Sequence, residues 1–122
     1  METLVITPHQ PIMMACKHFL PHAGRNGRAH WCHPERAWKV GFARTPKLVI
    51  LDVEASHFQQ SEQLYEALVS GDWFGEPIRD VLILASEPIS WPVGVWLPKP
   101  LTRCSWAGQC AVWGWGIKQN MI

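Results

Sequence analysis

The clearest hydrophobic pattern in the chain lies in its central third. The segments KLVILDV and IRDVLILAS are continuous apolar runs, which is typical of strands that are covered on both faces. Between them, apolar residues recur close to helical spacing, and Gly71 follows where a helix would end. We therefore expect a βαβ unit with a strand over 47–54, a helix over 56–70 and a strand over 79–86. The two strands would be parallel.

Two further sequence signals indicate where helices begin. Ser56 and Gln59 have the spacing of a capping box, whose side chains bond free backbone N–H groups at a helix start. Thr7 followed by Pro8 is typical of an N-cap residue and the first helical position. A short N-terminal helix is therefore expected to begin there and to end before Pro21.

The rest of the chain predicts shorter strands and loops. TLVIT at 3–7 is rich in β-branched residues, and AWKVGFA at 37–43 alternates in the way of a strand with one buried face. CAVWGWGIK at 110–118 also alternates and would be the last strand. The segment 21–34 is expected to be a loop, because its glycines favour turns. The proline-rich segment 87–100 should be irregular, or at best an edge strand.

Together these elements predict one globular domain over residues 1–122 of the α/β or α+β class. Its mixed sheet would have about five strands, built around the central βαβ unit, with one short N-terminal helix beside it. The length of 122 residues and the hydrophobic share of 48% suffice for one buried core. No internal repeat or linker divides the chain.

The N-terminal segment lacks the features of a secretion signal. It has no basic start, and Pro8 and Pro11 interrupt its apolar run. The sequence has no stretch of about 18 apolar residues that could span a membrane. We therefore expect a cytoplasmic protein without a membrane partner, in which the four cysteines are thiols.

Charge is distributed unevenly along the chain, although the net charge is only +1. Residues 1–51 contain seven Lys/Arg and two acids, a net charge of +5. Residues 52–90 contain one base and eight acids, a net charge of −7, and residues 91–122 add +3. This pattern either forms a bipolar surface for charged partners or mixes when the chain folds.

The segment 16–33, CKHFLPHAGRNGRAHWCH, concentrates residue types that bind metals. It holds two cysteines and four histidines. Cys16, His30 and Cys32 are the candidate ligands, and zinc is the cofactor that thiolate and imidazole ligands would hold. Their spacing differs from that of the common zinc motifs, which separate paired ligands by a few residues. The alternative is a buried cysteine followed by polar loop residues.

A second interpretation of this region uses its positive charges. Basic and aromatic residues interleave around the Gly-rich turn, namely Arg25, Arg28, Trp31, Arg36, Lys39 and Arg44. Cations pair with phosphates and a tryptophan face can stack a base, so nucleic acid is a candidate partner. The nearly neutral net charge and the lack of a known binding signature favour the alternative, a solvated loop with Trp38 in the core.

Asp52 and Glu54 lie two residues apart at the end of a predicted strand, so both should lie on one face. Ligands of open α/β sheets bind at this edge, where paired carboxylates could hold a divalent cation. The stretch LVILDVE resembles the first motif of DEDD-type 3′–5′ exonucleases, a hydrophobic strand followed by Asp-x-Glu. The resemblance covers only these residues and implies a metal-dependent nuclease. Such enzymes also need two further aspartates and usually a late histidine, whereas no histidine follows His57.

Those two acids have an alternative interpretation as ordinary residues at a strand end. Glu54 would then lie near a helix start, where its charge suits the helix dipole.

Tryptophans concentrate near the C-terminus, since five of the eight lie between residues 91 and 115. Tryptophan often anchors protein interfaces, and proline-braced loops hold such anchors at low entropic cost. The candidate partner-binding residues are Trp91, Trp96, Trp106, Pro92 and Pro98. We expect these tryptophans nearer the surface and Trp113 or Trp38 in the core. The alternative is that several of them fill the core beside the sheet.

These observations favour a small non-enzymatic binding protein that contacts a protein partner, or a second copy of itself, through its Trp/Pro-rich third. A nucleic-acid-binding protein that uses the loop 25–47 is the alternative. A small metal-dependent hydrolase or nuclease at Asp52 and Glu54 is a further alternative. The sequence has no phosphate-cradling loop, dinucleotide fingerprint or nucleophile elbow.

Overall fold

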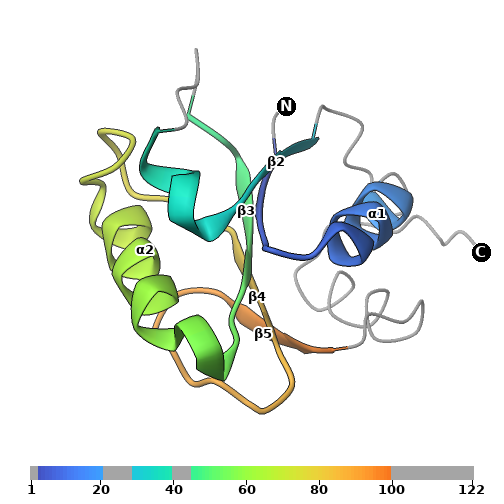
Figure 1. The fold of residues 1–122 in the computed structure, drawn as a ribbon. Helices are drawn as coiled ribbons and strands as arrows, with labels where there is room; N and C mark the ends of the chain where they lie inside the picture. The colour runs from blue at the N-terminus through green and yellow to red at the C-terminus, as the bar shows by residue number, and fades with distance from the viewer. Residues whose placement is uncertain (1–2, 21–28, 40–44, 100–122) are drawn as a thin grey trace, which may run out of the picture.

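A computed structural model describes residues 3–20, 29–39 and 45–99 of the chain. This part contains five strands, two α-helices and two 3-10 helices. In chain order they are β1 (Thr3–Ile6), α1 (Gln10–Phe19), β2 (Ala29–Cys32), η2 (Pro34–Lys39), β3 (Leu48–Asp52), η3 (Ala55–His57), α2 (Phe58–Ser70), β4 (Val81–Ala85) and β5 (Val95–Pro98) (Figure 1).

The five strands form one sheet in the order β2-β1-β3-β4-β5, and every pairing between them is parallel. From β1 the chain passes to β2 on one side, then returns to β3 on the other side and continues outward to β4 and β5. The direction therefore reverses between β1 and β3, which is the switch point of a doubly wound sheet with the flavodoxin-like order. Because the strands are parallel, their carboxyl ends meet at one edge of the sheet.

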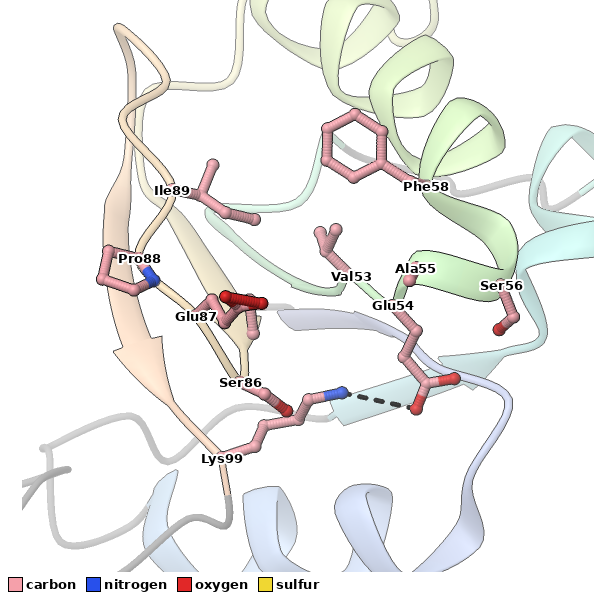
Figure 2. Close-up of a pocket in the computed structure, with 11 residues that line it drawn as sticks. Val53, Glu54, Ala55, Ser56, Phe58, Ser86, Glu87, Pro88, Ile89 and Lys99 are labelled. Atoms are coloured by element: carbon pink, nitrogen blue, oxygen red, sulfur yellow. Dashed lines mark hydrogen bonds and ion pairs between the residues drawn. The ribbon is translucent and has the colours of Figure 1, made fainter.

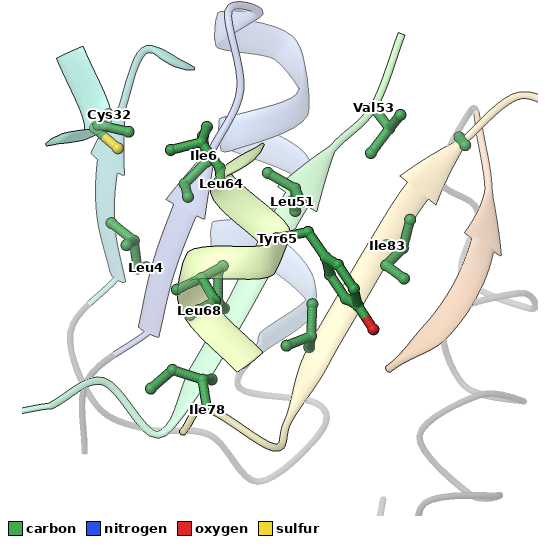
Figure 3. Packing of buried hydrophobic residues seen from close by; sticks show 14 residues of the cluster. Leu4, Ile6, Cys32, Leu51, Val53, Leu64, Tyr65, Leu68, Ile78 and Ile83 are labelled. Carbon is green, nitrogen blue, oxygen red and sulfur yellow. The ribbon is translucent and has the colours of Figure 1, made fainter. Parts of the chain in front are cut away.

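The two α-helices cover opposite faces of the sheet (Figure 1). In β3, Val49 and Leu51 pack on the α2 face, whereas Leu48 and Ile50 pack on the α1 face, since successive side chains of a strand point to opposite sides. Burial of both faces explains why this strand is an uninterrupted apolar run. Figure 3 shows the cluster on the α2 face, to which Leu64 of the helix and Leu51 of β3 both belong.

The α/β class, the central βαβ unit and the short N-terminal helix are confirmed. β3, α2 and β4 lie within the predicted ranges 47–54, 56–70 and 79–86, and β3 pairs with β4 in parallel. Gly71 follows α2 with a left-handed φ of 91°, as predicted for a glycine at the end of a helix. The sheet is more uniform than the expected mixed sheet, because all described pairings are parallel.

The predicted start of the N-terminal helix is wrong in detail. α1 begins at Gln10 after the N-cap residue His9, and Pro8 lies before the helix. The Thr7 hydroxyl accepts the His9 N–H at 3.1 Å and donates to Asp52 at 2.6 Å. A hydrogen bond to a carboxylate is stronger than one to a neutral group, so the tertiary contact determines where this hydroxyl points.

The capping box predicted at Ser56 and Gln59 does not form. An additional turn, η3, precedes α2, and Ser56 lies inside this turn instead of before a helix. Glu54 is the extended residue that precedes η3, and neither Glu54 nor His57 forms a side-chain cap. The pattern therefore predicted the helix correctly and its first turn incorrectly.

The strand predicted at 37–43 is also wrong where the structure describes it. Ala37–Lys39 belongs to η2, in which the Arg36 N–H donates to the His33 carbonyl at 2.9 Å. The Glu35 N–H donates to His33 Nδ1 at 3.1 Å. These local bonds satisfy the backbone without a sheet, which is how side chains in turns compete with strands. The remaining predicted positions lie outside the described residues.

The other predicted segments have different outcomes. Within the loop expected at 21–34, Ala29–Cys32 forms the edge strand β2, which pairs with β1. Within the proline-rich segment 87–100, residues Val95–Pro98 form the edge strand β5, as the sequence allowed. The strand predicted at 110–118 lies outside the described residues.

The connection between β4 and β5 is held against the rest of the fold. Tyr65 of α2 donates its hydroxyl to the Val93 carbonyl and accepts the Val93 N–H, both at 2.7 Å. Gly94 has a φ of 107°, and a Cβ at this position would lie 2.7 Å from the Val81 carbonyl oxygen. A glycine is therefore required where this connection approaches β4.

Candidate functional site

Polar and charged side chains from three strands converge at the carboxyl edge of the sheet. Thr7 follows β1, Asp52 ends β3 and Lys99 follows β5. Asp52 is fully buried, and each carboxylate oxygen has a partner. Thr7 Oγ1 donates to Oδ2 at 2.6 Å, and Lys99 Nζ donates to Oδ1 at 2.6 Å. The ammonium compensates a carboxylate whose burial would otherwise be costly.

Glu54 extends this cluster toward the surface. Its Oε2 is 2.5 Å from His9 Nε2 and 3.4 Å from Lys99 Nζ, and its Oε1 is 3.7 Å from His57 Nδ1. Desolvation by partial burial would raise the pKa of Glu54. The hydrogen bond with His9 and the positive charge of Lys99 outweigh desolvation, so the pKa lies below its ordinary value. Glu54 is therefore a carboxylate at neutral pH.

His9, Asp52 and Glu54 form a set of candidate metal ligands. One imidazole nitrogen and two carboxylate oxygens lie within 4.8 Å of one another. Ligands at about 2.1 Å from an ion are separated by about 3 Å, so modest side-chain rotations would close this set around an ion. Carboxylate oxygens suit Mg²⁺ and Mn²⁺, and imidazole suits Zn²⁺, so the donor set fits a divalent cation.

A cavity of about 660 Å³ opens beside the cluster, between the segments that follow β3 and β4 (Figure 2). Its polar wall includes Glu54, Ser56, Ser86, Glu87 and Lys99. Its apolar wall includes Val53, Phe58, Pro88 and Ile89. The volume is in the range of small-molecule sites. Figure 2 shows the Lys99 ammonium directed toward Glu54, and both side chains line this cavity.

The predicted cysteine ligands are separated by the sheet. Cys16 packs in the core on the α1 face, whereas Cys32 packs in the core on the α2 face. Burial, together with the nearby charge of Asp52, raises the pKa of Cys16 to about 12, and burial raises the pKa of Cys32 to about 11. Both are therefore protonated thiols at neutral pH. Within the described part of the chain, the candidate ligand set includes neither cysteine, nor does it include His30.

The predicted nucleic-acid loop is described only in part. Three of its residues lie outside the described ranges: Arg25, Arg28 and Arg44. Trp31 in β2 is 46% exposed and donates its indole N–H to the Thr7 carbonyl at 2.8 Å. Arg36 is exposed in η2, and Lys39 is the last residue of that helix. Contact with nucleic acid stays a prediction.

The prediction that Trp38 lies in the core is wrong. Its segment is a 3-10 helix instead of a strand, and its side chain is 49% exposed. The Trp38 ring lies 5.2 Å from that of Trp73, which in turn stacks on Phe74 at 4.8 Å. Trp113, the other tryptophan expected in the core, lies outside the described residues.

Two of the predicted partner-binding tryptophans lie at the edge of the core and are partly exposed. Trp91 and Trp96 are half-buried and pack against the cluster on the α2 face. The Trp91 ring is 4.4 Å from Tyr65 and 5.9 Å from Phe58. Trp96 donates its indole N–H to the Ala85 carbonyl at 2.9 Å, so its polar atom has a partner within the fold.

The other residues of the predicted partner surface differ in their exposure. Pro92 is exposed beside Trp91, and Pro98 is half-buried as the last residue of β5. Trp106 lies outside the described residues. A partner surface in this region stays a prediction.

Sequence reasoning found Asp52 and Glu54 but missed three residues of the cluster: Thr7, His9 and Lys99. Each follows a short apolar strand, at the position where the carboxyl ends of a parallel sheet meet. For Lys99 this signal was present in VWLPK, but the surrounding prolines concealed the strand. Assigning all five strands as parallel would have placed these residues at the same edge.

Comparison with known proteins adds no family to this description. No protein-family model matches the chain, and a search of curated proteins finds no significant similarity. No helix in the described ranges is both long enough and apolar enough to cross a membrane. Function is therefore inferred from the geometry of the site.

Proposed function

We propose that this protein is a small binding domain whose ligand is a divalent cation at the carboxyl edge of the sheet. His9, Asp52 and Glu54 would be the protein ligands. The observation that supports this most directly is that their three ligand atoms lie within 4.8 Å of one another. They lie at the carboxyl ends of β1 and β3, on the two sides of the switch point where doubly wound sheets bind ligands.

Lys99 would compete with the metal ion for the carboxylates. Its Nζ is 2.6 Å from Asp52 and 3.4 Å from Glu54, so it already supplies one positive charge. A divalent ion carries twice that charge and would displace the ammonium. The Lys99 side chain lines the neighbouring cavity, which offers it space to move. Metal affinity would therefore depend on the balance between Lys99 and the ion.

A metal-dependent hydrolase or nuclease is the enzymatic alternative. An ion at this position could lower the pKa of a bound water and so generate a nucleophile. The described residues that support this alternative are the same three ligands, so cation binding is the proposal that requires fewer additional groups.

A protein-interaction surface is a second candidate function. Phe58 is 40% exposed although it is a large apolar side chain, and its ring lies 5.9 Å from that of Trp91. Pro92, the residue after Trp91, is exposed. Neighbouring aromatic side chains at a surface are typical anchors of protein interfaces, which supports a partner in this region.

Titration with Mn²⁺, monitored by calorimetry and by the electron paramagnetic resonance of free Mn²⁺, tests the proposal. We expect one saturable site per chain. Asp52→Asn should lower the affinity about tenfold or more, because the ion loses an anionic ligand. Lys99→Gln should raise the affinity, because it removes the competing ammonium.

A matched control has the same charge change as Asp52→Asn but lies away from the site. Glu62→Gln serves this purpose, since Glu62 is exposed on α2, and it should leave the affinity unchanged. Circular dichroism would verify that each variant is folded. Absence of Mn²⁺ binding in both the wild type and Lys99→Gln would overturn the proposal.

A further inference from the structure

We infer that the cavity beside the charged cluster binds an organic ammonium ion that carries an apolar body, such as a protonated arylalkylamine. The inference deepens the proposed cation-binding function by naming a class of ligand. It rests on that function only through Glu54, which belongs both to the metal-ligand set and to the cavity wall. His9 and Asp52 do not line the cavity.

The charges on the cavity wall favour a positive ligand. Its ionisable side chains are Glu54, Glu87 and Lys99. The Lys99 ammonium is 2.6 Å from the buried Asp52 carboxylate, so a group outside the cavity compensates its charge. Glu87 is exposed, and no cation of the described residues lies within ion-pair distance of it. An anion in the cavity would therefore meet two carboxylates and an ammonium that is already paired.

The polar groups of the wall suit an ammonium better than a bare metal ion. Glu54 follows β3 and Glu87 follows β4, so the two carboxylates come from different sides of the cavity (Figure 2). Glu87 is absent from the compact ligand set that an ion would need. An ammonium has three N–H donors, and the hydroxyls of Ser56 and Ser86, which also line the cavity, add acceptors to the two carboxylates.

The apolar wall explains why the ligand should carry a hydrophobic body. Phe58 and Ile89 face the cavity from its two sides, and Val53 and Pro88 extend this surface (Figure 2). Phe58 is 40% exposed, so a ligand would remove apolar surface from water. An aromatic ring also attracts a cation over its face. The volume of about 660 Å³ accommodates an amine of this kind.

Three probes with the same ring and chain but different charges test the inference: 2-phenylethylammonium, 2-phenylethanol and 3-phenylpropanoate. Each would be titrated into the full chain, with backbone amide shifts recorded by NMR. We expect the ammonium to bind more tightly than the alcohol and the anion to bind least, with the largest shifts at Ser56, Ser86 and Ile89. Equal affinity for the three probes, or shifts confined to other residues, would overturn the inference.

Single variants test whether Glu87 makes the cavity prefer a positively charged ligand. Glu87→Gln should weaken 2-phenylethylammonium binding about threefold, because an exposed ion pair contributes modestly, and should leave 2-phenylethanol unaffected. Glu66→Gln, an exposed position elsewhere on α2, is the matched control. An ammonium affinity that is the same in Glu87→Gln and Glu66→Gln would contradict the inference.

Two variants distinguish failure of the proposed metal site from failure of the proposed ammonium site. Glu87→Gln should leave Mn²⁺ binding unchanged, because Glu87 is not in the metal-ligand set. Asp52→Asn should impair Mn²⁺ binding and should weaken but not abolish binding of the ammonium probe, because Asp52 does not line the cavity but compensates Lys99, which does. If the ammonium binds and Mn²⁺ does not, the inference stands and the proposed metal site fails.

Discussion

Asp52 determines the chemistry of the edge at the scale of one residue. A fully buried carboxylate is stable only when its oxygens have partners, and here a hydroxyl and an ammonium each approach to 2.6 Å. Thr7 and Lys99 therefore compensate the burial of the Asp52 carboxylate. Glu54, two residues further, is more accessible and shares the Lys99 ammonium with Asp52.

The lowered pKa of Glu54 predicts a dependence of stability on pH. In the folded chain this pKa lies below the ordinary value of 4.5, so the ionised carboxylate stabilises the fold above that pH. The contribution is lost as the pH falls through the folded pKa. In melting experiments, the Tm difference between wild type and Glu54→Gln should be constant near neutral pH and should shrink below pH 4.5.

Other acids also titrate in this range, so only the difference between the two proteins is informative. Glu62→Gln, a change at an exposed position of α2, should follow the wild-type profile. A Tm difference for Glu54→Gln that does not change on acidification would show that His9 and Lys99 do not stabilise the ionised carboxylate.

At the scale of elements, the β4–β5 connection determines where Lys99 lies. The Tyr65 hydroxyl forms two hydrogen bonds to Val93, and Gly94 then passes close to Val81 of β4. These contacts hold β5 against β4, and the residue after β5 therefore reaches the carboxyl edge. The position of Lys99 in the site therefore depends on the connection that precedes β5.

Gly94→Ala should destabilise the protein by about 2 kcal/mol or more, because it combines an unfavourable φ with a steric clash. The added Cβ would lie 2.7 Å from a backbone oxygen of Val81. Gly75→Ala is a matched control, since Gly75 has a φ of 83° but a Cβ added there would have no atom within 4 Å. Urea unfolding should show a clearly larger loss for Gly94→Ala, and equal losses would exclude the clash.

At the scale of the whole molecule, an ion pair links strands that are not neighbours. Asp52 ends β3 and Lys99 follows β5, with β4 between them. The pair therefore crosses the sheet edge and joins residues that are 47 positions apart in the chain. The same ion pair therefore holds the edge of the sheet together and sets the charge at the proposed site.

Lys99→Met should lower the free energy of unfolding by about 3 kcal/mol, because the buried Asp52 carboxylate would lose the ammonium that compensates it. The double variant Asp52→Asn with Lys99→Met should recover much of that loss, because no uncompensated charge remains. Urea unfolding of the two single variants and the double variant measures this coupling. Additive losses would show that the two side chains act independently.

Sequence patterns predicted the elements whose signals are local and failed where partners are distant. β3, α2 and β4 follow from two buried apolar runs, a helical period and Gly71. β2 carries no such signal, because its four residues become a strand only by pairing with β1. The prediction for Trp38 was wrong because backbone bonds to His33 form a turn where side-chain alternation indicates a strand.

The sequence by itself therefore determined the α/β class, the central βαβ unit and the position of Asp52 and Glu54 at a strand end. These follow from periodicity and spacing, which depend on residues that are near one another in the chain. Only the tertiary structure decided that Thr7 and Lys99 bond Asp52 and that His9 bonds Glu54. Those contacts join residues 45 to 47 positions apart, and the order of parallel strands, which no local pattern encodes, brings them together.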